Sequence, residues 1–213
     1  MVLVNERIHR RIVDKKKRLD SYRPLSPTLV RRLKEQMAIE YTYNSNAIEG
    51  NTLTLRETRL VIEEGITIDG KSIMETLEAK NHPKAIEFIE SLVDAGTEID
   101  EDALLKINRL IMSGIVEDAG RYRTTGVRIT GAAFTPPRSS EVRPKMNELL
   151  ELVQKNPDEY RPIELAAVFH HRFVQIHPFL EGNGRTARLL MNIILMKTGY
   201  PFIVIVSKRE RAK

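Results

Sequence analysis

The sequence predicts an all-α fold, a helical bundle that carries one short β-hairpin as a flap. Helix-capping residues recur along the chain, and apolar residues follow them at helical spacing. One segment, residues 120–144, lacks this periodicity, alternates polar and apolar residues for a short run and then contains paired prolines. We therefore expect helices on both sides of this segment and a surface hairpin within it.

Caps predict the helices of the first half of the chain. Ser26 before Pro27 is an N-cap followed by a proline at the first helical position, and Gly50 should end the helix that begins there. Further helix starts carry the capping residues Thr54 with Glu57, Ser72 with Glu75, and Asp100. Pro83 should kink or break the helix that follows Ser72, unless it begins a new first turn.

The second half should contain helices over residues 145–156, 162–175 and 186–197, with Gly199 as the last stop. No internal repeat interrupts this pattern. We expect a helical N-terminal region over residues 1–70 and a core over residues 71–213.

Composition bounds the class of protein. With 213 residues, 41% of them hydrophobic and 30% charged, the chain can bury one sizeable core. It contains no cysteine, which excludes disulfides and thiolate metal sites, and no apolar run of signal-peptide or transmembrane length. We expect a cytoplasmic, soluble protein without a membrane partner. The net charge of +5 comes from residues spread along the chain, so we expect no nucleic-acid partner.

The stretch HPFLEGNGRTARLL, residues 177–190, combines residue types that bind a polyphosphate. Pro178 biases His177 away from helical geometry, so one helix should end before it and another should follow the glycine-containing loop. A helix N-terminus offers free backbone N–H groups and the positive end of the helix dipole, which favour an anion. Gly182 and Gly184 would let the backbone approach that anion closely.

The charged residues of this stretch each suit a separate task. Arg185 and Arg188 lie three apart in the first helical turn and can form bidentate contacts with phosphates. Glu181 offers a hard oxygen ligand suited to Mg²⁺. His177 has a side chain whose ordinary pKa suits proton abstraction near neutral pH. A Walker A loop is excluded, because no strand precedes the glycines and no lysine follows the last one.

This stretch resembles the signature of Fic domain proteins, H-P-F-x-[D/E]-G-N-G-R-x-x-R. The matching residues are His177, Pro178, Phe179, Glu181, Gly182, Asn183, Gly184, Arg185 and Arg188. The similarity extends over about residues 75–206 and includes the segment GRYR before the expected flap. The resemblance implies an all-α fold with a hairpin flap and transfer of AMP from ATP to a hydroxyl side chain of a target protein.

The resemblance also implies a role for each residue. His177 would take the proton from a Ser, Thr or Tyr hydroxyl as it attacks the α-phosphorus, and Glu181 would hold Mg²⁺ between the α- and β-phosphates. The residues that would hold the nucleotide are Gly182, Asn183, Gly184, Arg185 and Arg188. An extended segment of the target would pair with the flap at Ile129, Thr130, Gly131 and Phe134. Gly184 and Arg185 argue against the kinase branch of the family, the Doc type.

A second stretch, SNAIEGN, resembles the inhibitory-helix motif of the same family, [S/T]-x-x-x-E-[G/N]. Ser45 and Glu49 are four residues apart and share a helix face, and Gly50 follows them. The resemblance implies that Glu49 pairs with Arg188, so that the arginine is occupied and the incoming γ-phosphate is repelled. We therefore expect an autoinhibited enzyme.

Several alternatives stay open at this point. A deAMPylase would use Glu49 to orient a water that removes AMP from a modified target. An ATP-responsive interaction module would bind nucleotide without significant catalysis, and relatives that transfer uridylyl or phosphocholine groups share the motif. The resemblance also implies a homodimer and a core that continues beyond Lys213, where relatives carry at least one more helix.

Overall fold

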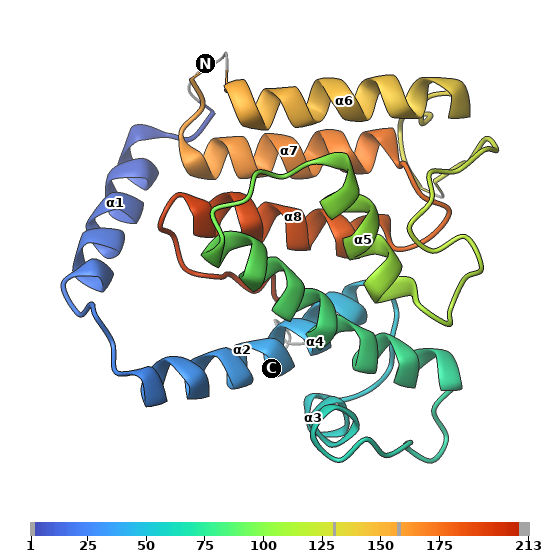
Figure 1. The fold of residues 1–213 in the computed structure, drawn as a ribbon, viewed down its shortest axis with the longest axis horizontal. Coiled ribbons are helices and arrows are strands. Elements are labelled where there is room, and N and C mark those ends of the chain that lie inside the picture. The colour runs from blue at the N-terminus through green and yellow to red at the C-terminus, as the bar shows by residue number, and fades with distance from the viewer. Residues whose placement is uncertain (1–2, 130, 157–158, 209–213) are drawn as a thin grey trace.

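The computed structural model of the chain describes residues 3–129, 131–156 and 159–208. Within these residues the chain forms a helical bundle (Figure 1). Its helices are α1 (Glu6–Asp20), α2 (Pro27–Ile48), α3 (Leu55–Glu63), α4 (Ile73–Asp94), α5 (Glu101–Met112), α6 (Ser139–Lys155), α7 (Pro162–Ile176) and α8 (Asn183–Lys197). The predicted all-α class is therefore confirmed for the described part of the chain. None of these helices is both long enough and apolar enough to cross a membrane.

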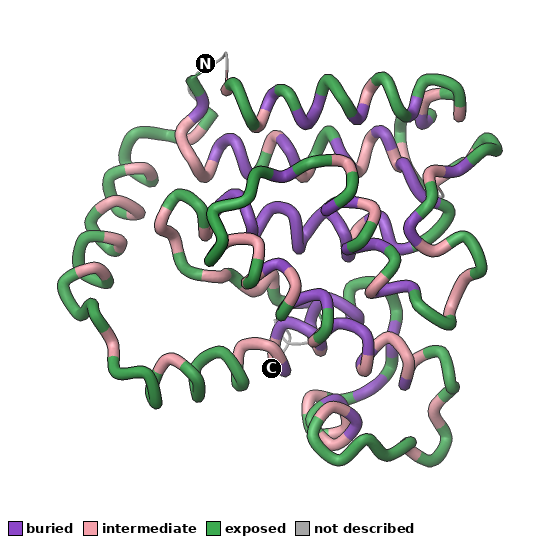
Figure 2. Tube along the Cα trace, viewed as in Figure 1, coloured by how far each residue is buried: buried purple, intermediate pink, exposed green. Residues whose placement is uncertain are grey.

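The helix α8 forms the centre of the bundle. It packs closely against α7 and also contacts α2, α4 and α5, while α6 covers the other side of α7 (Figure 1). Residues 185–195 of α8 are all buried (Figure 2). Two charged residues of the phosphate-binding motif, Arg185 and Arg188, therefore lie inside the bundle and must find partners there.

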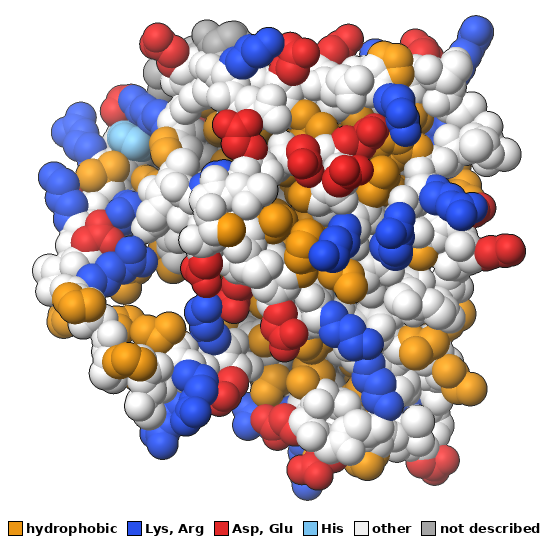
Figure 3. Space-filling model, in the orientation of Figure 1, with side chains coloured by type: hydrophobic (Ala, Val, Ile, Leu, Met, Phe, Trp, Pro, Cys, Tyr) orange, Lys and Arg blue, Asp and Glu red, His pale blue; other side chains and the backbone are white. Residues whose placement is uncertain are grey.

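Helix α1 and the first part of α2 extend away from this core. Helix α1 has no buried residue, and the buried residues of α2 begin only at Ile39. Figure 3 shows α1 and the start of α2 as an arm separated from the bundle by a gap. The chain before α1 is attached to α7, because the backbone N–H groups of Leu3 and Val4 both donate to Glu164 at 2.9 Å.

The predicted caps are confirmed. Ser26 Oγ accepts from the backbone N–H of Leu29 at the start of α2, where Pro27 is the first helical residue. Complete capping boxes begin α3 and α4, and a carboxylate cap begins α5; the capping residues are Thr54 with Glu57, Ser72 with Glu75, and Asp100. These local signals place the helix starts within one residue of the prediction.

Of the kink or break expected at Pro83, the break is wrong, and Pro83 does not begin a new helix either. Helix α4 continues through it without interruption, with Ala79 and Ala85 buried on either side. A proline inside a helix costs about 3 kcal/mol through its missing donor and its steric clash. Because α4 packs against α2, α5 and α8, tertiary burial along its length outweighs this local cost.

The predicted β-hairpin is also wrong. Between residues 124 and 138, the described part of the segment contains bends and a turn but no strand. Thr130 lies outside the described residues. The backbone N–H of Ala132 donates to the Ile129 carbonyl at 3.2 Å, which closes a tight turn and leaves no ladder. The run VRIT is too short for a stable two-stranded hairpin, and Pro136 and Pro137 cannot donate to a partner strand.

Candidate active site

The motif HPFLEGNGRTARLL forms the connection between α7 and α8. His177 is the C-cap of α7 and adopts a left-handed conformation with φ 51°, which is rare for a residue other than glycine. Gly182, with φ 78°, is the N-cap of α8, and the helix begins at Asn183, earlier than the predicted Thr186. Asn183 and Gly184 thus belong to the first helical turn, where backbone N–H groups lack intrahelical partners.

Side chains hold this loop rigidly. The side-chain oxygen of Asn183 accepts from the Phe179 N–H, and its amide donates to the Phe179 carbonyl, both at 2.9 Å. Asn108 on α5 donates to the Glu181 carbonyl at 3.1 Å and accepts from the Gly120 N–H at 2.9 Å. The polar groups of the Asn183 side chain are therefore engaged within the loop, and this side chain shapes the loop.

The glycine at 182 is required for two reasons. Its positive φ disfavours other residues, and a Cβ there would lie 2.7 Å from the sulfur of Met112. Only a residue without a side chain lets the loop lie this close to α5.

His177 is half-buried, and burial lowers its pKa below the ordinary value. The positive charge of Arg123 lowers this pKa further. Opposing contributions come from the Val174 carbonyl and from the carboxylates of Glu181 and Glu49. The net result is an imidazole that is neutral, and so able to accept a proton, near pH 7.

The structure places Glu49 and Arg188 together. Arg188 donates from Nε to Ser45 Oγ at 2.9 Å, and from a terminal nitrogen to the Ser45 carbonyl at 2.9 Å and to Glu49 Oε1 at 2.7 Å. The Arg188 side chain is 6% exposed and that of Glu49 33% exposed. We name this cluster of Ser45, Glu49 and Arg188 the Arg188 latch.

The Glu49 carboxylate lies directly against the first turn of α8. A Cβ built on Gly184 would clash with Glu49 Oε1, so the carboxylate occupies the space that this glycine leaves open. Gly50 follows with φ 103°, a conformation that suits glycine and turns the chain away at the end of α2. The carboxylate therefore fills the position where an anion would meet the helix N-terminus.

A second carboxylate, absent from the sequence-based prediction, holds the other arginine. Arg185 donates to Glu78 Oε1 on α4 at 2.6 Å, and the two side chains are 6% and 13% exposed. The other Glu78 oxygen accepts from the Asn51 side chain at 2.8 Å. The Nε of Arg185 is buried and has no hydrogen-bond partner among the residues that the structure describes. In the sequence, Glu78 is marked only by its position between the apolar residues Leu77 and Ala79 of an expected helix.

One residue could contribute a metal ligand. Glu181 is exposed in the loop between α7 and α8. Within the described ranges, no group of three or more His, Asp or Glu residues is arranged to hold a metal ion. One carboxylate does not make a resident metal site, but it fits Mg²⁺ that binds together with phosphate oxygens and water.

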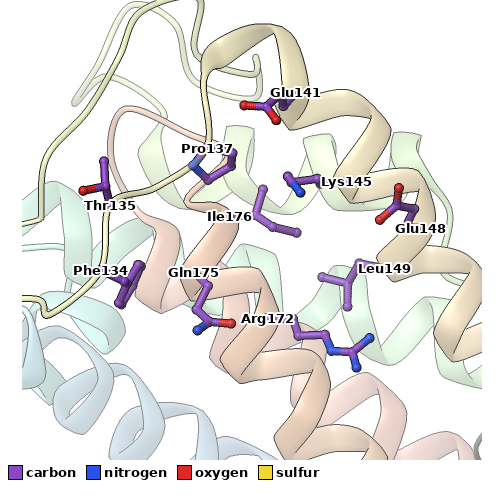
Figure 4. A pocket seen from close by; sticks show the side chains of 10 residues that line it. All are labelled: Phe134, Thr135, Pro137, Glu141, Lys145, Glu148, Leu149, Arg172, Gln175 and Ile176. Atoms are coloured by element: carbon purple, nitrogen blue, oxygen red, sulfur yellow. The ribbon is translucent and has the colours of Figure 1, made fainter.

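Of the predicted target-contacting residues, Phe134 lines a cavity beside α7. Ile129 is half-buried, Gly131 is exposed with φ 79°, and Phe134 is 38% exposed. Phe134 lines a cavity of about 580 Å³ together with residues of α6 and α7, among them Lys145 (Figure 4). Phe134, Thr135 and Pro137 thus form one wall of a cavity that extends to Ile176 near the C-terminus of α7.

Known proteins are similar to this chain. Residues 98–195 match the Fic/DOC family. Protein adenylyltransferase Fic of Nematostella vectensis is 39% identical over 198 residues, which is 92% of this chain and 46% of the relative. Protein adenylyltransferase fic-1 of Caenorhabditis elegans is 37% identical over 182 residues, which is 84% of this chain and 35% of the relative. The chain therefore spans less than half the length of these two curated relatives.

Solved structures agree with this assignment. A Fic domain containing signaling protein from Bacteroides thetaiotaomicron superposes with a TM-score of 0.83 at 34% identity, covering 95% of this chain and 78% of that protein. Fic-1 from Caenorhabditis elegans superposes with a TM-score of 0.79 at 35% identity, covering 92% of this chain and 58% of that one. With the signature at the α7–α8 connection, these similarities show that the chain belongs to the Fic/DOC family.

Proposed function

We propose that this chain is an autoinhibited protein adenylyltransferase. It transfers AMP from ATP to a Ser, Thr or Tyr hydroxyl of a target protein, and of itself, and releases pyrophosphate. The observation that carries the proposal is the pairing of Glu49 with Arg188 against the N-terminus of α8. The relatives named protein adenylyltransferases support the class of reaction.

His177 acts as the general base. Its burial keeps the imidazole neutral near pH 7, so a ring nitrogen can accept the proton of the target hydroxyl. The hydroxyl oxygen forms a bond to the α-phosphorus, and the bond from this phosphorus to the oxygen bridging the α- and β-phosphates breaks. The AMP moiety stays on the target, and pyrophosphate leaves with the bonding electrons.

The first turn of α8 holds the phosphates. Backbone N–H groups around Gly182 and Gly184 face the anion, and the dipole of α8 adds positive potential there. Asn183 contributes through the loop shape that its side chain maintains. Arg185 and Arg188 neutralise the β- and γ-phosphates, so the charge that develops on pyrophosphate is stabilised in a partly buried site.

Glu181 would hold Mg²⁺ that arrives with the nucleotide, and the bound ion would neutralise charge between the α- and β-phosphates. The exposed position of Glu181 leaves its carboxylate accessible to such a complex.

The segment 125–137 would contact the target. Its residue Phe134 lines the cavity next to α7, together with Ile176 at the end of the helix that His177 caps. A target segment that lies along this wall would bring its hydroxyl toward the imidazole. The described part of this segment forms no strand ladder, so its remaining backbone groups could donate to and accept from an extended chain.

The Arg188 latch would control the reaction by inhibiting it. While Glu49 binds Arg188, the arginine cannot form a bidentate contact with the γ-phosphate, and the carboxylate repels the incoming anion. A hydrogen bond between charged groups contributes about 1.5–3 kcal/mol, which corresponds to roughly 10- to 100-fold in nucleotide affinity.

Replacement of Glu49 tests the proposal. We expect Glu49→Gly to increase the transfer of labelled AMP from ATP to the protein itself, and His177→Ala in that background to abolish it. Glu64→Gly is a matched control, because Glu64 is an exposed C-cap glutamate before a glycine at the end of α3. Equal labelling of wild type and Glu49→Gly would refute autoinhibition, and absence of labelling in every variant would refute the transferase.

One observation favours a second candidate, removal of AMP. Glu49 is a third exposed, and its charge acts on His177, so it is placed to orient a water between itself and the imidazole. Wild type should then release AMP from a modified target, while Glu49→Gly should not. Release of pyrophosphate from ATP distinguishes both enzymes from an interaction module that only binds nucleotide.

A further inference from the structure

We propose that Arg123 is a positioning residue that fixes His177 and both ends of the segment 125–137 in one geometry. This inference rests on the proposed function of His177. Arg123 lies in the GRYR segment between α5 and α6, and is 3% exposed. It has no place in the phosphate-binding motif.

The guanidinium of Arg123 contacts three separate parts of the chain. Its Nε donates to the His177 carbonyl at 2.8 Å. One terminal nitrogen donates to the Thr125 carbonyl at 2.8 Å, and the other to the Pro137 carbonyl at 2.6 Å and the Ile176 carbonyl at 3.3 Å. A single planar group thus connects the end of α7 with the beginning and the end of the segment.

Among the described residues, every hydrogen-bond acceptor of this guanidinium is a neutral backbone carbonyl. Burial without a carboxylate partner is unfavourable for a guanidinium, and it lowers the pKa of Arg123. An apolar residue would fill the same space without this cost, but it could not satisfy four carbonyls. The rigid fork of Arg can do so, and the compact ammonium of Lys cannot reach all of them.

These hydrogen bonds matter because His177 has an unusual backbone conformation. The residue holds a left-handed backbone with φ 51°, and such a conformation persists only where the surroundings impose it. Arg123 binds the carbonyl of His177 through its side chain, and its own backbone N–H donates to the Pro178 carbonyl at 2.9 Å. Together these bonds fix the backbone on the C-terminal side of the imidazole.

The guanidinium of Arg123 also joins the two ends of the segment 125–137, as a hairpin ladder would have done. The segment has no strand ladder in its described part, so its two ends are joined through the Arg123 side chain instead. Pro137, whose carbonyl is bound, lines the cavity beside α7 with Phe134 and Ile176 (Figure 4). Loss of the bond at Pro137 would release one wall of this cavity and the adjoining target-contacting residues.

Kinetics in the Glu49→Gly background test the inference. We expect Arg123→Lys and Arg123→Gln to lower kcat for AMP transfer about 100-fold and to raise the KM for the target, because misplacement of a reacting group by about 1 Å has this effect. The Kd for ATP, measured by calorimetry, should stay within about twofold, since Arg123 contacts no predicted phosphate ligand. Arg121→Lys is the matched control, because Arg121 is exposed two residues away.

A second measurement does not depend on catalysis. In the wild-type background, chymotrypsin should cleave after Phe134 at least about tenfold faster in Arg123→Gln than in Arg121→Lys. The inference is overturned if the Arg123 variants keep kcat, target KM and cleavage rate within twofold of the parent. It is also overturned if both variants lose cooperative folding, because Arg123 would then serve the whole fold. If Glu49→Gly transfers no AMP, the proposed function fails, and the cleavage rates alone decide on Arg123.

Discussion

Arg188 on α8 donates to the carboxylate of Glu49 at the end of α2 at 2.7 Å, across 139 positions of the sequence. Arg185, one turn earlier on α8, donates in the same way to Glu78 on α4 at 2.6 Å. Both arginines that would hold phosphates are therefore paired with carboxylates from helices that precede the Fic signature. Glu49 is more exposed than Glu78. We therefore expect the pair of Glu49 and Arg188 to regulate ATP binding and the pair of Glu78 and Arg185 to stabilise the fold.

The hydroxyl of Ser45 should contribute to inhibition. It accepts from Arg188 at 2.9 Å, and Ser45→Ala removes this bond while Glu49 and the Ser45 carbonyl remain. We expect ATP to bind about 3- to 10-fold more tightly than in wild type, and less tightly than in Glu49→Gly, because one hydrogen bond of the latch is lost. Calorimetric titration with ATP measures this difference. Ser91→Ala, at an exposed serine of α4, should leave the Kd unchanged; the prediction fails if both variants bind like wild type.

The pair of Glu78 and Arg185 should stabilise the fold. Glu78→Gln removes a largely buried charge and leaves Arg185 without its counter-ion, so we expect the free energy of unfolding to fall by about 3 kcal/mol. Glu151→Gln is the control, because the pair of Glu151 and Lys155 is more than half exposed and should contribute less than about 1 kcal/mol. Urea unfolding monitored by circular dichroism compares the two variants. Equal urea midpoints in the two variants would show that the buried pair stabilises the fold no more than the exposed pair does.

As pH decreases, the rate of AMP transfer should fall only below the ordinary pKa of histidine. Burial lowers the pKa of His177, and the base is active in its neutral form, so activity should persist as pH falls through about 6.5 and disappear only at lower pH. The Glu49→Gly variant also lacks a carboxylate that raises this pKa, which shifts the fall in rate further toward acid. Initial rates of AMP transfer from about pH 5 to 8 test this order. A rate that already falls at or above the ordinary pKa of histidine would contradict this prediction.

His82 should make stability depend on pH. It is fully buried beside Tyr41, and burial, followed by the charges of Arg185 and Arg188, lowers its pKa well below the ordinary value. Below about pH 6.5 the unfolded chain binds a proton at this histidine that the folded chain does not, so stability falls as pH falls, by about 1.4 kcal/mol per unit.

Comparison with His82→Gln isolates this effect, since all other titrating groups are common to both proteins. Urea unfolding at about pH 7.5 and 5.5 should show a smaller loss of stability in the variant. Parallel losses in the two proteins would exclude His82 as the cause.

Local sequence signals predicted most helices. The caps at Ser26, Thr54, Ser72 and Asp100 lie where expected, because a capping side chain bonds to a backbone group within three residues. Predictions failed where tertiary packing or pairing over longer distances decided the result. Helix α4 continues through Pro83 because it is packed on several sides, and the flap contains no described strand because no partner strand is formed.

The sequence by itself determined the chemistry of the α7–α8 connection, since its residues are contiguous and a helix N-terminus orients them through the backbone alone. Apart from the pairing of Glu49 with Arg188, which the family resemblance implied, only the tertiary structure decided what those residues contact in the protein itself. Glu78 and Arg185 are 107 positions apart, and Arg123 lies 54 positions before His177. Such pairs depend on which helices pack together, and no periodicity or cap encodes that choice because these signals act over only a few residues.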